Sequence, residues 1–196
     1  MNKFVLASAS PRRRELLENI GMKFDILVSS ADESQIDRGL APDMLVKELA
    51  LLKAVESAKH IEGDRLVIGS DTVVVHEGRI LEKPRDREDA RNMLKSLSGS
   101  EHYVYTGVCV LRTSDFTAES RCEKTAVRFK PLSDNTIENY LNTNEYADKA
   151  GGYGIQGKGS LLVEGITGDY FNVVGLPLGL LSDMLREEFD VDILGN

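Results

Sequence analysis

The stretch Leu66-Val67-Ile68-Gly69-Ser70-Asp71-Thr72-Val73-Val74-Val75 is the strongest strand-forming segment of this chain. Its two ends are apolar and rich in β-branched residues, which is typical of a strand in the centre of a sheet. Asp71 interrupts the apolar run. An ionised carboxylate in a buried strand is costly unless it is paired, hydrogen-bonded or bound to a metal. The segment therefore predicts both a central strand and a candidate functional carboxylate.

Two explanations of Asp71 remain open. It could simply accept backbone hydrogen bonds at the end of a strand, or it could belong to a functional site. Because side chains alternate across a strand, Ser70 and Thr72 are expected on the face opposite Asp71. Gly69 is expected to leave space beside the carboxylate. These neighbours favour the functional interpretation.

The segments around this strand predict an α/β fold. Apolar residues recur at helical spacing between Pro42 and about His60. The runs 103–112 and 122–129 are expected to pair as antiparallel strands around a polar turn, which makes the sheet mixed. The other predicted strands are Phe4–Ala7, Phe24–Val28, Ile80–Leu81 and Leu161–Ile166, and the other predicted helices are Arg12–Ile20, Asp86–Leu97, Ser133–Leu141 and one ending at Phe189. We expect a single domain over residues 1–196, with a mixed central β-sheet flanked by helices.

The run Ser8-Ala9-Ser10-Pro11-Arg12-Arg13-Arg14 lies where the first strand meets the first helix. Proline is well suited to the first helical position. The free N–H groups of a helix start favour an anion, and arginine adds bidentate hydrogen bonds to phosphate oxygens. The plainer alternative is a Ser-Pro helix start with solvated arginines. Three arginines in a first turn oppose the helix dipole, so we favour an anion site.

Composition and charge narrow the range of functions. The formal net charge of −8 argues against sequence-independent binding to nucleic acid polymers or to anionic membranes. Small phosphorylated ligands remain compatible with this charge, since an acidic protein can still direct a few cations inward. The candidates for such a set of cations are Arg12, Arg13, Lys53 and Lys83.

The cysteines indicate the compartment. Cys109 and Cys122 are the two cysteines of the chain, and both lie in predicted strands. They could form a disulfide, but no apolar run is long enough for a signal peptide or a membrane-spanning helix. We therefore expect two reduced, buried thiols in a cytoplasmic protein without a membrane partner.

Glu33 and Lys53 each have a functional and a plainer interpretation. Glu33, in a polar loop, could join Asp71 as an oxygen ligand of a divalent metal, since Mg²⁺ sites often use one or two carboxylates with waters and phosphates. Lys53 lies beside the apolar stripe of the long helix, so its stem runs toward the interior. The alternatives are a solvated glutamate and a lysine that reaches the surface.

Two well-known glycine motifs are matched in the late part of the chain but rejected. Residues 152–157 match G-x-G-x-x-G without following a clear strand or opening a helix. Residues 152–158 match most of a P-loop, yet Gly159 stands where Ser or Thr must reach Mg²⁺. The segment 148–157 is either a structural turn or a shaped loop whose aromatic residue and amide, Tyr153 and Gln156, read a base.

Five segments, taken in order, resemble the Maf family of nucleoside triphosphate pyrophosphatases, first known as septum formation proteins. Each segment alone is modest, whereas their ordered combination is specific and spans nearly the whole chain. They are Leu6-Ala7-Ser8-Ala9-Ser10-Pro11-Arg12-Arg13, Gly69-Ser70-Asp71-Thr72, Leu81-Glu82-Lys83-Pro84, Asp148-Lys149-Ala150-Gly151-Gly152-Tyr153-Gly154-Ile155-Gln156-Gly157 and Val174-Gly175-Leu176-Pro177.

The resemblance implies a mixed α/β fold with two lobes around a cleft, similar to the inosine triphosphate pyrophosphatases. It also implies hydrolysis of a nucleoside triphosphate to the monophosphate and pyrophosphate with Mg²⁺ or Mn²⁺. By the same resemblance, Asp71 matches the catalytic base or a metal-linked carboxylate, and Glu33 matches an acidic position associated with metal. The positions that match phosphate contacts are Ser8, Arg12, Arg13, Lys53 and Lys83.

The resemblance also indicates a substrate branch. Arg12, Thr72 and Gln156 match positions linked to specificity, and the sequence is similar to the branch that hydrolyses dTTP, UTP and modified uridine triphosphates. The sister branch, acting on 7-methyl-GTP, typically has Gln after the aspartate, where this chain has Thr72. The segment Glu145-Tyr146-Ala147 departs from the family, which often has Trp there. This departure concerns the rim of the pocket.

A second function remains in view. The chain could instead bind nucleotides as a regulator of septum formation and cell division, without requiring turnover. Asp71 and Lys83 favour the enzyme over this regulator. The sequence leaves open whether the protein is a homodimer.

Overall fold

The computed structural model describes residues 3–195. They form two compact units, each assembled from separated stretches of the chain. Unit 1 comprises the described residues up to Asp71, Thr106–Glu123 and the described residues from Gly175 onward; unit 2 comprises Thr72–Tyr105 and Lys124–Val174. The prediction of a single domain stays a prediction, as does that of a cleft.

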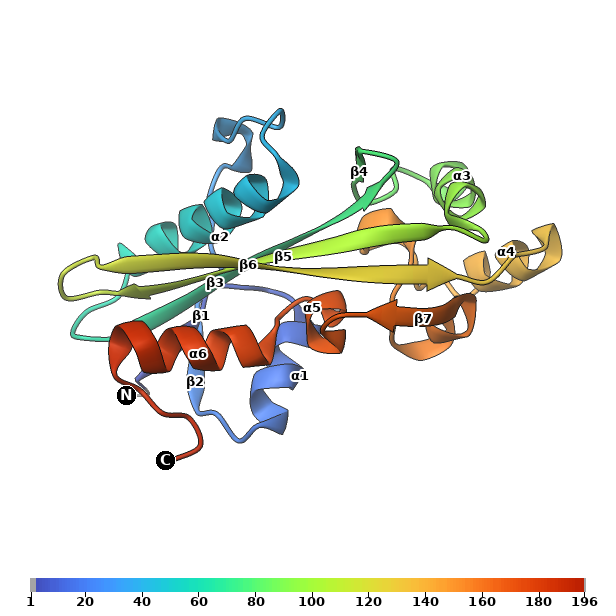
Figure 1. Cartoon of the computed structure of the whole chain (residues 1–196). Coiled ribbons are helices and arrows are strands. Elements are labelled where there is room, and N and C mark those ends of the chain that lie inside the picture. Colours follow the sequence, from blue (N-terminus) through green and yellow to red (C-terminus); the bar gives the residue numbers. More distant parts are fainter. Residues whose placement is uncertain (1–2, 196) are drawn as a thin grey trace. The chain divides into compact units, whose positions relative to one another are not determined.

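A mixed seven-stranded sheet has the strand order β2-β1-β3-β5-β6-β7, with β4 paired to β3 (Figure 1). Strand β1 pairs in parallel with β2 and β3, whereas β4 with β3 and β7 with β6 are antiparallel. The strands are β1 (Phe4–Leu6), β2 (Phe24–Ile26), β3 (Leu66–His76), β4 (Arg79–Leu81), β5 (Glu101–Arg112), β6 (Ala118–Phe129) and β7 (Val163–Thr167). The mixed sheet with flanking helices is confirmed, and the segment around Asp71 lies in the inner strand β3, as predicted.

Helix α2 (Pro42–Ala58) packs very closely on the strands of unit 1. A Cβ at Gly69 would lie 2.2 Å from the carbonyl oxygen of Ala50, and one at Gly107 would lie 2.1 Å from that of Val46. Both glycines therefore let the helix backbone approach the sheet. The expectation that Gly69 leaves space beside Asp71 is wrong, because the backbone of α2 fills that space.

The core of unit 1 combines small helical residues with apolar strand residues. Ala50, Ala54 and Ala58 of α2 pack in one cluster with Val67 of β3 and Cys109 of β5. Cys109 is buried and Cys122 half-buried, and both are free thiols, so the disulfide alternative is not formed. Burial raises the pKa of each thiol to about 11. Helices α1 (Pro11–Asn19) and α6 (Leu178–Phe189) complete this unit.

Unit 2 has its own core, built around helices α3 (Arg87–Leu97) and α4 (Asp134–Leu141). The predicted start of α4 at Ser133 is confirmed, since the side chain of Ser133 caps this helix. Gly99 follows α3 with a φ of 66°, a conformation that suits the end of a helix. The residues at the centre of this core include Leu94, Val104, Phe129, Ile137, Tyr140 and Tyr153.

Some short elements differ from the prediction. Residues 161–162 do not open a strand but end the 3-10 segment η3 (Gly157–Leu162), with Leu161 69% exposed. The 3-10 turns η1 (Glu33–Gln35) and η2 (Ala150–Gly152) and the short helix α5 (Tyr170–Val174) were not predicted. Such single turns depend on local hydrogen bonds that leave little hydrophobic periodicity. No helix within residues 3–195 has both the length and the apolar character needed to cross a bilayer.

Candidate functional site

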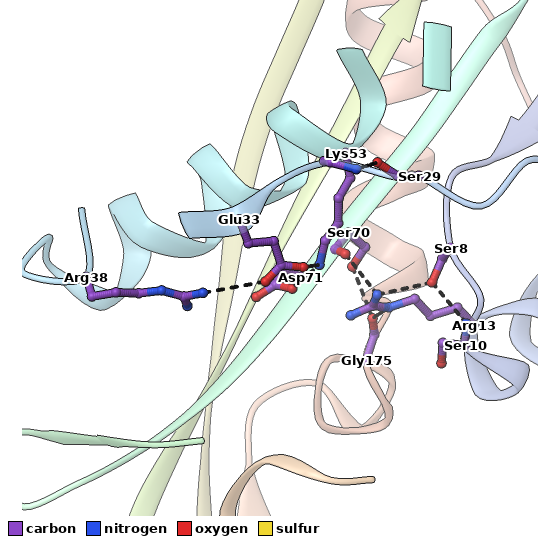
Figure 2. Close-up of polar contacts among 11 residues, drawn as sticks. Ser8, Ser10, Arg13, Ser29, Glu33, Arg38, Lys53, Ser70, Asp71 and Gly175 are labelled. Carbon is purple, nitrogen blue, oxygen red and sulfur yellow. Dashed lines mark hydrogen bonds and ion pairs between the residues drawn. The ribbon is translucent and has the colours of Figure 1, made fainter. Parts of the chain in front are cut away.

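Two carboxylates of unit 1 share one ammonium group. The Nζ atom of Lys53 lies 2.5 Å from Oδ1 of Asp71 and 2.9 Å from Oε1 of Glu33 (Figure 2). The side chains of Lys53 and Asp71 are each 16% exposed, and that of Glu33 is 40% exposed. The sequence therefore named three residues, far apart along the chain, that meet at one point. We call Glu33, Lys53 and Asp71 the acidic cluster.

The fold explains why these three side chains converge. Asp71 and Gly69 share one face of β3, the face on which α2 packs. Since Gly69 admits α2 closely, Lys53 of that helix can reach the carboxylate directly. Glu33 opens the turn η1, which begins with Asp32 accepting a hydrogen bond from the backbone N–H of Ser34. The Asp71 carboxylate is thus paired with the Lys53 ammonium, which offsets the free-energy cost of burying a charged group.

The charges of the cluster are compensated locally. Arg38 lies with Nη2 3.5 Å from Oε2 of Glu33, which adds a second cation to the two carboxylates. Arg38 is a partner that the sequence did not single out. The sequence around Arg38, in a polar loop, does not indicate which carboxylate this arginine will pair with.

The donor set is compatible with a divalent metal. No group of three or more His, Cys, Asp and Glu side chains within residues 3–195 is placed to hold one. Glu33 and Asp71 nevertheless hold one cation jointly, the ammonium of Lys53. Hard oxygen ligands from one or two carboxylates, completed by water and phosphate, suit Mg²⁺.

Arg13 ties the first helix to the end of the buried part of β3. Its Nε donates to the carbonyl oxygen of Gly175, and its Nη1 donates to that of Ser70, both at 2.8 Å (Figure 2). Burial lowers the pKa of the Arg13 guanidinium, and the nearby carboxylate of Asp71 opposes that shift. An arginine stays charged at neutral pH regardless. Arg13 is therefore a cation in a fixed position that interacts electrostatically with the carboxylate of Asp71.

The other residues of the strand-to-helix junction have different surroundings. Ser8 is buried, and its hydroxyl accepts hydrogen bonds from Nη1 of Arg13 at 3.3 Å and from the backbone N–H of Ser10 at 3.2 Å. Arg12 is half-buried on α1. Arg14 instead pairs with Glu18 on the exposed side of the helix at 2.7 Å. The predicted start of the helix at Pro11 is confirmed.

The turn at Gly175 also contributes to the site, through a backbone carbonyl that the side-chain pattern of the sequence does not indicate. Its carbonyl oxygen accepts from Arg13 and also from the hydroxyl of Ser70, at 3.2 Å. The φ of Gly175 is 123°, a conformation that side-chain-bearing residues rarely adopt. Ser70 thus faces this turn while Asp71 faces Lys53, which agrees with the predicted alternation along the strand.

The remaining predicted site residues belong to unit 2. Thr72 is half-buried on β3, Lys83 is exposed just after β4, and Gln156 is half-buried in the glycine loop, by which we mean residues 150–157. Tyr153 of this loop is 5% exposed and lies in the core. Of the two alternatives for this loop, a base-reading role of the Tyr153 ring is excluded by its burial, and only the amide of Gln156 stays a candidate for reading a base.

Comparison with known proteins gives one consistent answer. The pattern of a family described as "Maf-like protein" matches residues 3–188. A "dTTP/UTP pyrophosphatase" from Acetivibrio thermocellus is 52% identical over 99% of this chain and 98% of its own length. One from Thermoanaerobacter sp. is 50% identical over 98% of this chain and 100% of its own. A solved dITP/XTP pyrophosphatase from Mycobacterium abscessus covers 64% of this chain and 72% of that one at 15% identity, with a TM-score of 0.37, which is too low to support an argument.

Proposed function

Because this chain belongs to the family of Maf-like proteins, we propose that it is a hydrolase that converts dTTP and UTP to the nucleoside monophosphate and pyrophosphate. The observation that carries the proposal is the full-length similarity, at about half of all positions, to proteins named for this activity. We extend the substrates to modified uridine triphosphates, whose removal would keep the nucleotide pool clean. A role in nucleotide metabolism follows.

The acidic cluster supplies the chemistry in this proposal. Water attacks the α-phosphorus, the bond between the α-phosphorus and the bridging oxygen breaks, and pyrophosphate leaves. Asp71 orients this water and accepts its proton, as a general base must from within hydrogen-bond reach. Lys53 fixes the Asp71 carboxylate, since their 2.5 Å contact leaves it little freedom to rotate.

The triphosphate needs positive charge around it. We assign phosphate contacts to Ser8, Arg12, Arg13, Lys53 and Lys83. The fixed position of Arg13, with two backbone carbonyls as acceptors, supports this role because a cation that is already oriented loses little entropy on binding. Phosphoryl transfer depends mainly on such positioning and on electrostatic stabilisation.

We infer that the enzyme uses a divalent cation, Mg²⁺ or Mn²⁺, held by Glu33 and Asp71. When bound, such a cation neutralises charge on the triphosphate. Glu33 and Asp71 already share one cation, the ammonium of Lys53, which supports the proposal that their oxygen atoms can hold one metal ion jointly once Lys53 is displaced.

We assign the choice of base to Arg12, Thr72 and Gln156. Thr72 directly follows Asp71 along β3, which supports its assignment to the substrate-binding residues. We also expect a cytoplasmic protein.

A product assay tests the proposal and its alternative. Purified protein is incubated with Mg²⁺ and, separately, dTTP, UTP, 7-methyl-GTP and ITP, and the products are resolved by ion exchange. We expect monophosphate and pyrophosphate from dTTP and UTP. Tight binding of dTTP without turnover would instead support a nucleotide-binding regulator of septum formation. Preferred hydrolysis of 7-methyl-GTP would contradict the substrate branch.

A further inference from the structure

Tyr153 lies in the middle of the glycine loop, but its side chain packs in the core of unit 2. Its ring meets those of Phe129 and His102 edge-on, with centroid distances of 4.6 and 5.3 Å. Its hydroxyl lies 2.6 Å from Nε2 of His102. Two buried polar groups thus satisfy each other directly beneath the loop.

The His102 ring depends on this contact. His102 is fully buried on β5, and burial lowers its pKa to about 4, so the ring is neutral at physiological pH. A neutral imidazole has one donor and one acceptor nitrogen. Its Nδ1 is buried and has no hydrogen-bond partner within residues 3–195. Removal of the Tyr153 hydroxyl would therefore leave both ring nitrogens unsatisfied, which is costly in a core.

The backbone on both sides of Tyr153 is also fixed. The N–H of Gly151 donates to the carbonyl oxygen of Glu82 at 3.1 Å, one residue before Lys83. The N–H of Gly154 donates to the hydroxyl of Tyr140 at 3.3 Å. The loop is thereby tied to the segment that carries Lys83. An anchor at Tyr153 holds the parts of unit 2 to which a phosphate contact and a base contact are assigned.

Glu145 fixes the chain just beyond Gln156. Its carboxylate oxygens accept from the backbone N–H groups of Lys158 and Gly159, each at 3.3 Å. A Cβ at Gly157 would lie 3.1 Å from the same carboxylate, so the fit there is tight. Gln156 is therefore held between two anchors, Tyr153 before it and Glu145 after it.

We propose that His102 and Glu145 are positioning residues that set base selectivity by holding the glycine loop, and with it Gln156, in the conformation that recognises a pyrimidine nucleotide. His102 acts through the hydroxyl of Tyr153, and Glu145 acts through the backbone after Gln156. This inference rests on the proposed function. It assigns selectivity to residues that touch no part of the substrate themselves.

Tyr153→Phe removes the hydroxyl and keeps the ring. The experiment measures kcat and KM for dTTP and for ITP, the dissociation constant of the α,β-methylene analogue of UTP, and Tm. We expect about a tenfold higher KM for dTTP, a kcat within about twofold of the parent, and a tenfold smaller preference for dTTP over ITP, the size of one lost hydrogen bond. His102→Gln replaces the imidazole by an amide that also carries a donor and an acceptor, so it should show the same changes as Tyr153→Phe to a smaller extent. Glu145→Gln should show the same rise in KM and the same loss of preference for dTTP.

Tyr105→Phe is the matched control, since Tyr105 lies on β5 under the ammonium of Lys124. It should leave both KM and selectivity unchanged. A Tyr153→Phe protein with a lower Tm but the parental KM and base preference would overturn the inference, because the pair would then serve stability alone. If this variant does not fold, His102→Gln and Glu145→Gln are judged by the same criteria. Absence of hydrolysis by the parent protein would instead refute the proposed function, and the analogue's dissociation constants would still decide the inference.

Discussion

Asp71 is the residue on which the proposed hydrolysis depends most. In Asp71→Asn the side chain keeps its size but loses the charge that pairs with Lys53 and the ability to take a proton. We expect kcat for dTTP to fall by about a thousandfold or more, the scale seen when one well-placed electrostatic group is lost. The matched control is Asp134→Asn, because the Asp134 side chain is 83% exposed. Equal loss in both variants, or parental activity in Asp71→Asn, would remove Asp71 from the mechanism.

Lys53 gives a second prediction at this scale. Its ammonium lies between the two carboxylates assigned to the metal, so it competes with a divalent cation for them. Lys53→Met should bind Mn²⁺ about tenfold more tightly in calorimetry without nucleotide, while its turnover of dTTP falls. Lys53→Arg keeps the positive charge and should keep the Mn²⁺ affinity of the parent protein. Unchanged affinity in Lys53→Met would mean that the metal does not use Glu33 and Asp71.

The residues of the acidic cluster could be chosen from the sequence for different reasons. Asp71 stands out because a charge interrupts a buried strand. Taken alone, Lys53 is also explained as a lysine that reaches the surface, and Glu33 as a solvated acid of a loop. The family resemblance, rather than residue chemistry, selected them. Gly69 was misinterpreted, because spacing along a strand does not reveal what packs above it.

At the scale of secondary-structure elements, the close contact between α2 and β3 should control both stability and activity. Gly69→Ala would place a Cβ 2.2 Å from the carbonyl oxygen of Ala50, so the helix that carries Lys53 must move. We expect a loss of about 3 kcal/mol in the free energy of unfolding, measured by urea denaturation, together with reduced kcat.

Gly179→Ala is the control for that change. Gly179 lies in α6 of the same unit, and nothing lies within 4 Å of a Cβ there. We expect this substitution to be neutral or to stabilise by up to about 1 kcal/mol, since alanine favours a helix. If Gly69→Ala behaved like Gly179→Ala, the close approach of α2 would not constrain the site.

Elements with strong hydrophobic periodicity were predictable, and single turns were not. The strand around Asp71 and the helix that begins at Pro42 have long, regular patterns. The glycine loop has none, and the sequence left open whether its one aromatic residue reads a base or belongs to a structural turn. Tyr153 lies inside because a histidine 51 residues earlier in the sequence supplies its hydrogen-bond partner, which no local pattern reveals.

The stability of the whole molecule should depend on pH through His102. Burial lowers its pKa from 6.5 to about 4, so between these values the unfolded chain binds a proton that the folded chain does not. The stabilisation from the neutral ring is complete above pH 6.5 and is lost as the pH falls toward 4. From pH 7 to 5 the loss from this group should be about 2 kcal/mol.

Comparison with a variant separates the contribution of His102 to the pH dependence of stability from the contribution of the carboxyl groups. The free energy of unfolding is measured in urea at pH 7 and pH 5 for the parent and for His102→Gln. The parent should lose about 2 kcal/mol more than the variant over this interval. Identical losses would show that the ring is not buried in its neutral form.

For the molecule as a whole, the sequence pattern predicted the fold class, whereas only the family resemblance implied a division into two parts. Alternating helices and strands together with one hairpin pattern suffice to predict a mixed sheet. The strands β3, β5 and β6 each contribute residues to both compact units. Contacts that link residues so far apart along the chain leave no periodic signal.

The central claim is that this protein directs water to the α-phosphorus of a pyrimidine nucleoside triphosphate. Hydrolysis of dTTP in water enriched in ¹⁸O, followed by mass spectrometry of the products, tests it most directly. The account predicts one ¹⁸O atom in dTMP and none in the released pyrophosphate. Label in inorganic phosphate released with dTDP, or in the pyrophosphate, would contradict it.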